Sequence, residues 1–173
     1  MRKQKGFSLI ELLIVVAIIL IIAAIAIPNL LRARIAANES SAVASVRTVN
    51  TAQVAYNSAY PTVGYATSLG DLGGATPCVP ASNGACLIDN FLAQAIPGGT
   101  GKSGYVFLAT GVVTGGATNN TAFVSAAAPI KVNSTGNRDF CSTNDGVLRS
   151  QMGSPGDTPV NTLANCLNFP VAQ

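Results

Sequence analysis

The hydrophobic pattern separates an apolar N-terminal segment from a longer, more polar remainder. After six residues that include three basic side chains, the 21 residues from Phe7 to Ile27 are apolar except for Ser8 and Glu11. A helix of this length rises 1.5 Å per residue and is about 32 Å long, enough to cross the hydrocarbon core of a bilayer. The pattern therefore predicts a membrane-spanning helix over residues 7–27.

The pattern changes at Pro28 from wholly apolar to amphipathic. One set of side chains recurs at spacings of three and four: Ala42, Val46, Val49, Gln53, Tyr56 and Tyr60. This spacing predicts a helix over residues 28–60 with one face packed on a globular head. Proline has no N–H and disfavours helix in the residue before it, so we expect an interruption or bend at Pro28 and a helix end near Pro61.

Residues 61–173 have the composition of loops and short strands, with much Gly, Thr, Ser and Asn. A short helix is expected over Leu87–Ile96, and strands over Gly104–Thr110, Ala122–Ala127, Ile130–Val132 and Gly146–Arg149. Short runs with brief connections favour antiparallel pairing. The predicted fold class is α+β, a long N-terminal helix packed on a small antiparallel sheet. The predicted domains are 1–6, a leader; 7–27, the membrane helix; 28–60, the amphipathic helix; and 61–173, the head.

The charge distribution argues for a membrane orientation and against nucleic-acid binding. Ten basic and seven acidic side chains give a net charge of +3, and Arg2, Lys3 and Lys5 supply the excess. Without them the chain is neutral, so no specific nucleic-acid site is expected. Basic residues before the span place the N-terminus in the cytoplasm.

The side chains available for chemistry are few, which argues against an enzyme. The chain has no His, the usual general base and the commonest metal ligand, and its acids are scattered. A calcium site at Asp139, Asn144 and Asp145 is an alternative, but their spacing does not match the calcium-loop motif. We expect no catalytic residues, no cofactor and no metal.

Four cysteines, an even number in a chain with a targeting segment, indicate two disulfides formed outside the cytoplasm. Three pairings are possible, and sequence proximity favours Cys78–Cys86 with Cys141–Cys166. A zinc site is the alternative, although the chain has no C-x-x-C pair.

The apolar segment has two conventional interpretations. A secretory signal peptide would be cleaved after Ala24-Ile25-Ala26, and an uncleaved signal anchor would only tether the head. The apolar run exceeds the usual 7–15 residues of a signal peptide, and Glu11 interrupts its start.

The stretch from Gly6 to Ile19, continuing through Ala24-Ile25-Ala26-Ile27-Pro28, resembles the prepilin leader junction of type IV pilins and type II secretion pseudopilins. It combines a basic leader, a Gly, a Phe and a Glu at a fixed offset. The resemblance implies that a membrane peptidase cuts between Gly6 and Phe7 and N-methylates Phe7. Two segments of the head, 134–140 and 145–149, are similar to the closing hairpin of pilin-like heads, although Cys141 departs from that pattern.

The same resemblance implies assembly roles for Phe7, Glu11 and Pro28. Glu11 would pair with the Phe7 amine of a neighbouring subunit, and Pro28 would lie where the packed filament helix loosens. Ser8-x-x-Glu11 also matches a capping box, a local role compatible with the first.

These expectations describe a structural subunit of a type IV pilus (fimbrium) that serves adhesion, motility or DNA uptake. It would be a single-pass inner-membrane protein that enters a homo-oligomeric helical filament outside the cell. Its partners would be the prepilin peptidase and an assembly platform and ATPase encoded elsewhere. The alternatives are a type II secretion pseudopilin in a periplasmic pseudopilus and a signal-anchored extracytoplasmic binding protein.

Overall fold

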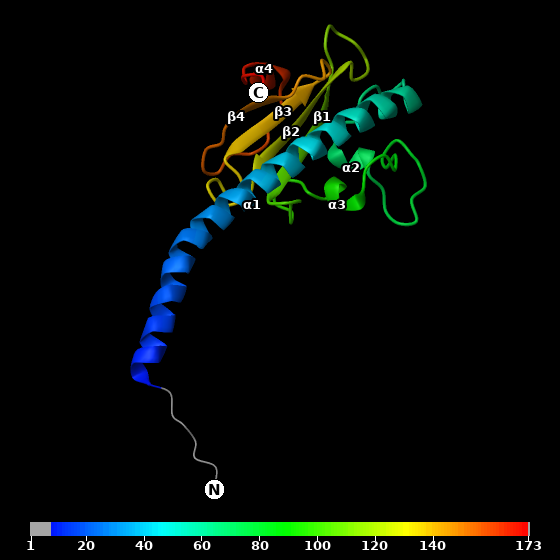
Figure 1. Cartoon of the computed structure of the whole chain (residues 1–173). Helices are drawn as coiled ribbons and strands as arrows, with labels where there is room; N and C mark the ends of the chain where they lie inside the picture. Colours follow the sequence, from blue (N-terminus) through cyan, green and yellow to red (C-terminus); the bar gives the residue numbers. More distant parts are fainter. Residues whose placement is uncertain (1–7, 173) are drawn as a thin grey trace. The chain divides into compact units, whose positions relative to one another are not determined.

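The computed structural model describes residues 8–172, and the chain forms two compact units, Met1–Arg34 and Ile35–Gln173. The elements in chain order are α1 (Leu9–Ala59), α2 (Leu69–Leu72), α3 (Asn90–Ala93), β1 (Tyr105–Val112), β2 (Ala122–Pro129), β3 (Arg138–Thr143), β4 (Arg149–Met152) and α4 (Leu163–Leu167) (Figure 1).

Helix α1 contains Pro28 as an interior residue, so an interruption there is wrong, and the alternative, a bend at Pro28, stays a prediction. A proline removes a single backbone donor, and the helix-forming residues on both sides continue the hydrogen-bonded ladder. The helix ends at Ala59, and its predicted end near Pro61 is confirmed.

The amphipathic stripe of α1 forms one side of the main core. Ala42, Val46, Val49, Gln53 and Tyr56 are buried, and Tyr60 packs partly buried against the same cluster. The sheet contributes Tyr105, Phe107, Ala109, Ala127 and Phe140 to this core. The stripe therefore packs on the sheet as the sequence predicts, because side chains three and four apart share one helix face.

The sheet is antiparallel with strand order β1-β2-β3-β4 (Figure 1). Side chains alternate between its faces. Phe140, opposite Ala127, belongs to the core under α1, whereas Cys141, opposite Ala126, belongs to a second apolar cluster with Cys166 and Phe169 of the C-terminal tail. The sheet thus has α1 on one face and the tail on the other, and the predicted α+β fold class is confirmed.

Several predicted boundaries are wrong because tertiary hydrogen bonds set them. Strand β2 runs to Pro129, where its pairing with β1 ends, so Ile130–Val132 is no strand. Strand β4 begins at Arg149, where Gly146–Arg149 was expected to end. The helix predicted over Leu87–Ile96 is four residues long, because the N–H groups of Leu87 and Ile88 bond to Leu72 O instead.

Candidate assembly site

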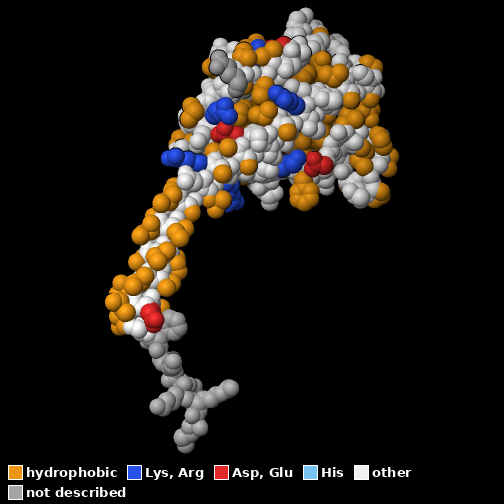
Figure 2. Space-filling model, in the orientation of Figure 1, with side chains coloured by type: hydrophobic (Ala, Val, Ile, Leu, Met, Phe, Trp, Pro, Cys, Tyr) orange, Lys and Arg blue, Asp and Glu red, His pale blue; other side chains and the backbone are white. Residues whose placement is uncertain are grey.

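The described part of the N-terminal unit, residues 8–34, is an almost fully exposed apolar helix. Every residue in this range is exposed except Ala23, which is half-buried, and Glu11 is its one acid. Hydrophobic side chains cover the segment in Figure 2, with acidic side-chain atoms near its start. The helix is long and apolar enough to cross a membrane.

Glu11 lies in the first turn of α1 and closes it. The Ser8 N–H donates to Glu11 Oε2 at 3.0 Å, and the Leu12 N–H donates to Ser8 O at 3.3 Å. A carboxylate here caps a free backbone donor and interacts favourably with the positive end of the helix dipole. Gly6 and Phe7, the predicted processing pair, lie outside the described residues.

One side of this helix is a continuous apolar strip at helical spacing. It consists of Leu9, Leu12, Leu13, Val16, Ala17 and Leu20, which together line a shallow groove. Spacings of three and four place these side chains on one face, as in helices that pack against other helices. The segment can therefore be buried by lipid or by other apolar helices.

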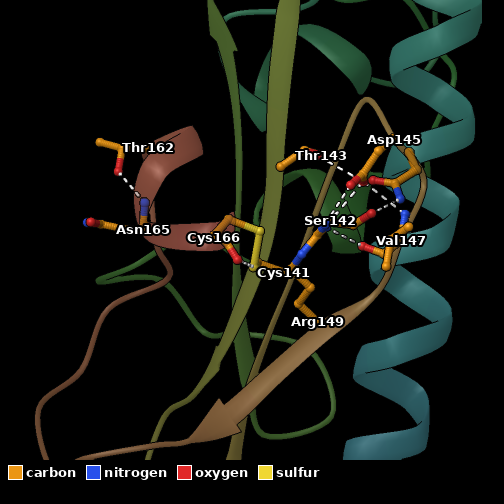
Figure 3. The surroundings of a disulfide bond; sticks show 10 residues. Cys141, Ser142, Thr143, Asp145, Val147, Arg149, Thr162, Asn165 and Cys166 are labelled. Carbon is orange, nitrogen blue, oxygen red and sulfur yellow. Dashed lines mark hydrogen bonds and ion pairs between the residues drawn. A yellow bond between two sulfur atoms is a disulfide. The ribbon is translucent and has the colours of Figure 1, made fainter. Parts of the chain in front are cut away.

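The head carries two disulfides, Cys78–Cys86 and Cys141–Cys166, which are the two pairs that proximity favours. Cys141 lies in β3 and Cys166 in α4, and both are fully buried (Figure 3). The second disulfide therefore attaches the tail to the sheet across sequence positions 25 residues apart.

An ion pair between a buried acid of α1 and a partly exposed arginine joins α1 to the start of β3. Glu39 is 8% exposed, and its carboxylate accepts from Arg138 Nη2 at 2.8 Å and Nε at 2.9 Å. The Asn137 N–H donates to the other carboxylate oxygen at 2.9 Å. Paired charge-assisted hydrogen bonds of this kind fix geometry as well as charge. The sequence predicts no role for Glu39. The one signal in the sequence is that Glu39 is an isolated acid close to the amphipathic stripe.

The turn before β4 is held by Asp145. Its carboxylate pairs with Arg149 at 2.6 Å and accepts from the Thr143 hydroxyl and the Val147 N–H, all labelled in Figure 3. The hydrogen bond from Arg149 is the main reason that the pKa of Asp145 falls to about 2. Asp145 therefore already has a cation as partner. Within residues 8–172, no three His, Cys, Asp or Glu side chains gather as metal ligands would.

A match to a family model identifies the N-terminal motif of the chain. Residues 1–27 match the family model described as the prokaryotic N-terminal methylation motif. The motif adjoins an exposed apolar helix, and the fold, a long helix packed on a small antiparallel sheet, is α+β and pilin-like.

Three relatives match the chain over segments longer than this motif. The type IV wide pilus major component PilA4 of Thermus thermophilus is 68% identical over 40 residues, 23% of this chain and 30% of the relative. The type IV major pilin protein PilA of Myxococcus xanthus is 46% identical over 54 residues, 31% of this chain and 24% of the relative. The type II secretion system core protein G of Vibrio cholerae is 42% identical over 65 residues, 36% of this chain and 44% of the relative.

The matched segments span less than half the length of each of these relatives. No solved structure matches the chain significantly. The chain is thus similar, over its N-terminal motif and over these matched segments, to type IV pilins and a type II secretion system core protein.

Proposed function

We propose that the protein is a structural subunit of a type IV pilus. It is inserted in the inner membrane, cut after Gly6, methylated at the Phe7 amine and extracted into a filament by an ATPase and a platform protein. The observation that carries this proposal is the N-terminal helix, whose apolar side chains are exposed in residues 8–34 while one acid remains among them. A bundle of such helices would bury this surface in the filament.

Glu11 is the proposed link between subunits. A carboxylate at the centre of a membrane helix costs roughly 2.5–3.5 kcal/mol on insertion scales, so a positive partner favours the assembled state. The amine of a neighbouring Phe7 is such a partner. The Ser8 N–H occupies Oε2, and a carboxylate accepts more than one donor, so the local cap and the intersubunit pair are compatible.

The second candidate is a type II secretion pseudopilin. The match to the Vibrio cholerae protein covers 65 residues, more than either of the other two matches. Surface filaments under native expression support the pilus. A secretion defect on deletion, without surface filaments, supports the pseudopilus.

Two variants of Glu11 distinguish the effect of its charge from the effect of its hydrogen bond to the Ser8 N–H. Glu11→Gln keeps an oxygen that can accept from the Ser8 N–H but has no charge, whereas Glu11→Ala loses both. We expect both variants to be processed normally and to form at least tenfold fewer filaments by electron microscopy, since removing one member of a buried ion pair costs about 3–5 kcal/mol.

The control is the exposed head acid Asp89 changed to Asn, which should leave filament numbers unchanged. Mass spectrometry of the mature N-terminus should find methylated Phe7 in every variant. Wild-type filament numbers from Glu11→Gln would contradict the charge pair, and a mature chain that starts at Ile27 would overturn the processing as well.

A further inference from the structure

Two arginines follow the uncharged part of α1. Residues 12–31 carry no charged side chain. Because α1 is continuous here, Leu30 and Leu31, which are 71% and 44% exposed, extend its exposed apolar surface. Arg32 and Arg34 come next, and both residues are exposed. The surface of the helix therefore changes from apolar to cationic within one turn.

The length of the uncharged stretch matches the thickness of a bilayer's hydrocarbon core. Glu11 is the charged residue before this stretch, and Arg32 is the charged residue after it. At 1.5 Å per residue the helix rises about 32 Å between them, and a hydrocarbon core is about 30 Å thick. When residues 12–31 span this core, Arg32 and Arg34 lie at the headgroups of the leaflet away from the N-terminus. Long basic side chains at such a boundary place their charge among the headgroups.

The described part of the chain supplies no anion to these two arginines. The ion pairs found in residues 8–172 include neither Arg32 nor Arg34. The acid nearest to them in sequence is Glu39, whose two carboxylate oxygens already accept from Arg138 and from the Asn137 N–H. A guanidinium without a carboxylate partner can bind another oxyanion, and its planar set of donors suits phosphate.

The two arginines point to different sides of α1. Successive residues of a helix are about 100° apart around its axis, so Arg32 and Arg34 are about 200° apart and do not face each other. One phosphate cannot therefore bind both guanidinium groups. Each arginine is placed to bind a separate headgroup, while the acyl chains of that lipid pack on the apolar side chains of the preceding turns.

We propose that Arg32 and Arg34 bind the phosphates of anionic phospholipids in the leaflet away from the N-terminus. The inference rests on the proposed function, because it requires the N-terminal helix to lie in a bilayer. Anionic lipids are favoured over zwitterionic ones, whose headgroup amine neutralises the phosphate. These contacts fix the depth of α1 in the membrane, and extraction of the subunit into a filament must break them.

Lipid titration followed by native mass spectrometry measures this binding. Full-length protein in detergent micelles would be titrated with phosphatidylglycerol or with phosphatidylcholine. Every sample would carry Arg2→Gln, Lys3→Gln and Lys5→Gln, which remove the leader cations. One arginine near an anionic surface strengthens binding about fivefold. We therefore expect Arg32→Gln/Arg34→Gln to weaken phosphatidylglycerol binding by about 5- to 25-fold and to leave phosphatidylcholine binding unchanged.

Two control variants separate charge at this place from charge in general. Arg47 is another exposed arginine of α1, outside the listed ion pairs of residues 8–172 and about 20 Å further along the helix axis than Arg34. Arg47→Gln should bind phosphatidylglycerol as wild type does. Arg32→Lys/Arg34→Lys keeps both charges and should retain most of the affinity. All these positions are exposed, so the substitutions should leave the fold unchanged.

Three results would overturn the proposal: equal affinities of the wild type for the two lipids, wild-type phosphatidylglycerol binding by Arg32→Gln/Arg34→Gln, or an equal loss in Arg47→Gln. Glycerol 3-phosphate has no acyl chains, and equally tight binding of this soluble phosphate would overturn it as well. Liposome flotation keeps the two proposals apart. Protein that does not float with liposomes contradicts membrane insertion, whereas protein that floats without a preference for phosphatidylglycerol contradicts only the role of the arginines.

Discussion

At the scale of single residues, the head holds two aspartates six positions apart with opposite acid–base behaviour. Asp145 faces the guanidinium of Arg149 and two neutral donors, and its pKa is lowered. Asp139 is buried, and this burial raises its pKa to about 6. The sequence presents both as acids of one hairpin. A hydrogen bond from Arg149 lowers the pKa of Asp145, and burial raises the pKa of Asp139.

Asp145→Asn should weaken the head at neutral pH. Asparagine can still accept from Thr143 and Val147 but cannot pair with Arg149, and a partly exposed pair of this kind contributes about 1 kcal/mol after solvent screening. The pKa of Asp145 is lowered, so this contribution is present above pH 3.8 and is lost as the pH falls through about 2. Urea unfolding of the full chain should show the difference from wild type at pH 7 and little of it at pH 2. An equal difference at both pH values would contradict the charge interpretation.

At the scale of elements, α1 is one helix with two kinds of surface. Over residues 8–34 its apolar side chains are exposed in all directions, and over residues 35–59 a narrow stripe is buried on the sheet. An all-round apolar helix needs lipid or other helices around it, whereas a stripe needs only one packed face. The same element is therefore apolar enough in its first part to cross a membrane, and in its second part it forms one side of the head's main core.

Phe140→Ala should test the packing between α1 and the sheet. Phe140 is 1% exposed within the main core, and removing its ring should lower the free energy of unfolding by about 3–5 kcal/mol. The matched control is Phe91→Ala, because Phe91 is 83% exposed and its loss should cost less than about 0.5 kcal/mol. Denaturant unfolding of the full chain followed by near-UV circular dichroism compares the two. Equal effects would contradict the assigned core.

At the scale of the whole molecule, the two disulfides stabilise different parts of the head. Cys78–Cys86 closes a surface loop with a sequence separation of 8, and Cys141–Cys166 joins the sheet to the tail with a separation of 25. The longer loop loses more entropy when it is closed in the unfolded chain. Cys141 and Cys166 also form part of the second apolar cluster.

Replacing both cysteines of a pair with Ala should therefore have unequal effects. By loop entropy alone, loss of Cys141–Cys166 costs about 3.5 kcal/mol and loss of Cys78–Cys86 about 2.5 kcal/mol. The buried contacts of Cys141 and Cys166 add to the free energy lost with the first of these disulfides. Thermal unfolding of each double variant beside wild type checks the order, and a larger loss from Cys78→Ala/Cys86→Ala would contradict it.

The sequence by itself determined the features that depend on neighbours within about four residues. These are the apolar span with its acid, the buried stripe of α1 and the helix end before Pro61, because helical spacing and backbone sterics act locally. Pro28 does not interrupt α1, since the loss of one donor does not stop a helix that continues on both sides.

Tertiary structure alone decided which distant groups meet. The distant contacts depend on strand register and on loop paths: the Glu39–Arg138 pair, the burial of Asp139, the end of β2 at Pro129 and the shortening of α3. A shift of one residue in register exchanges the faces of a strand, so no local pattern specifies these contacts. The sequence predicts the apolar helix and its acid. The pKa shifts of the acids in the head depend on the folded sheet.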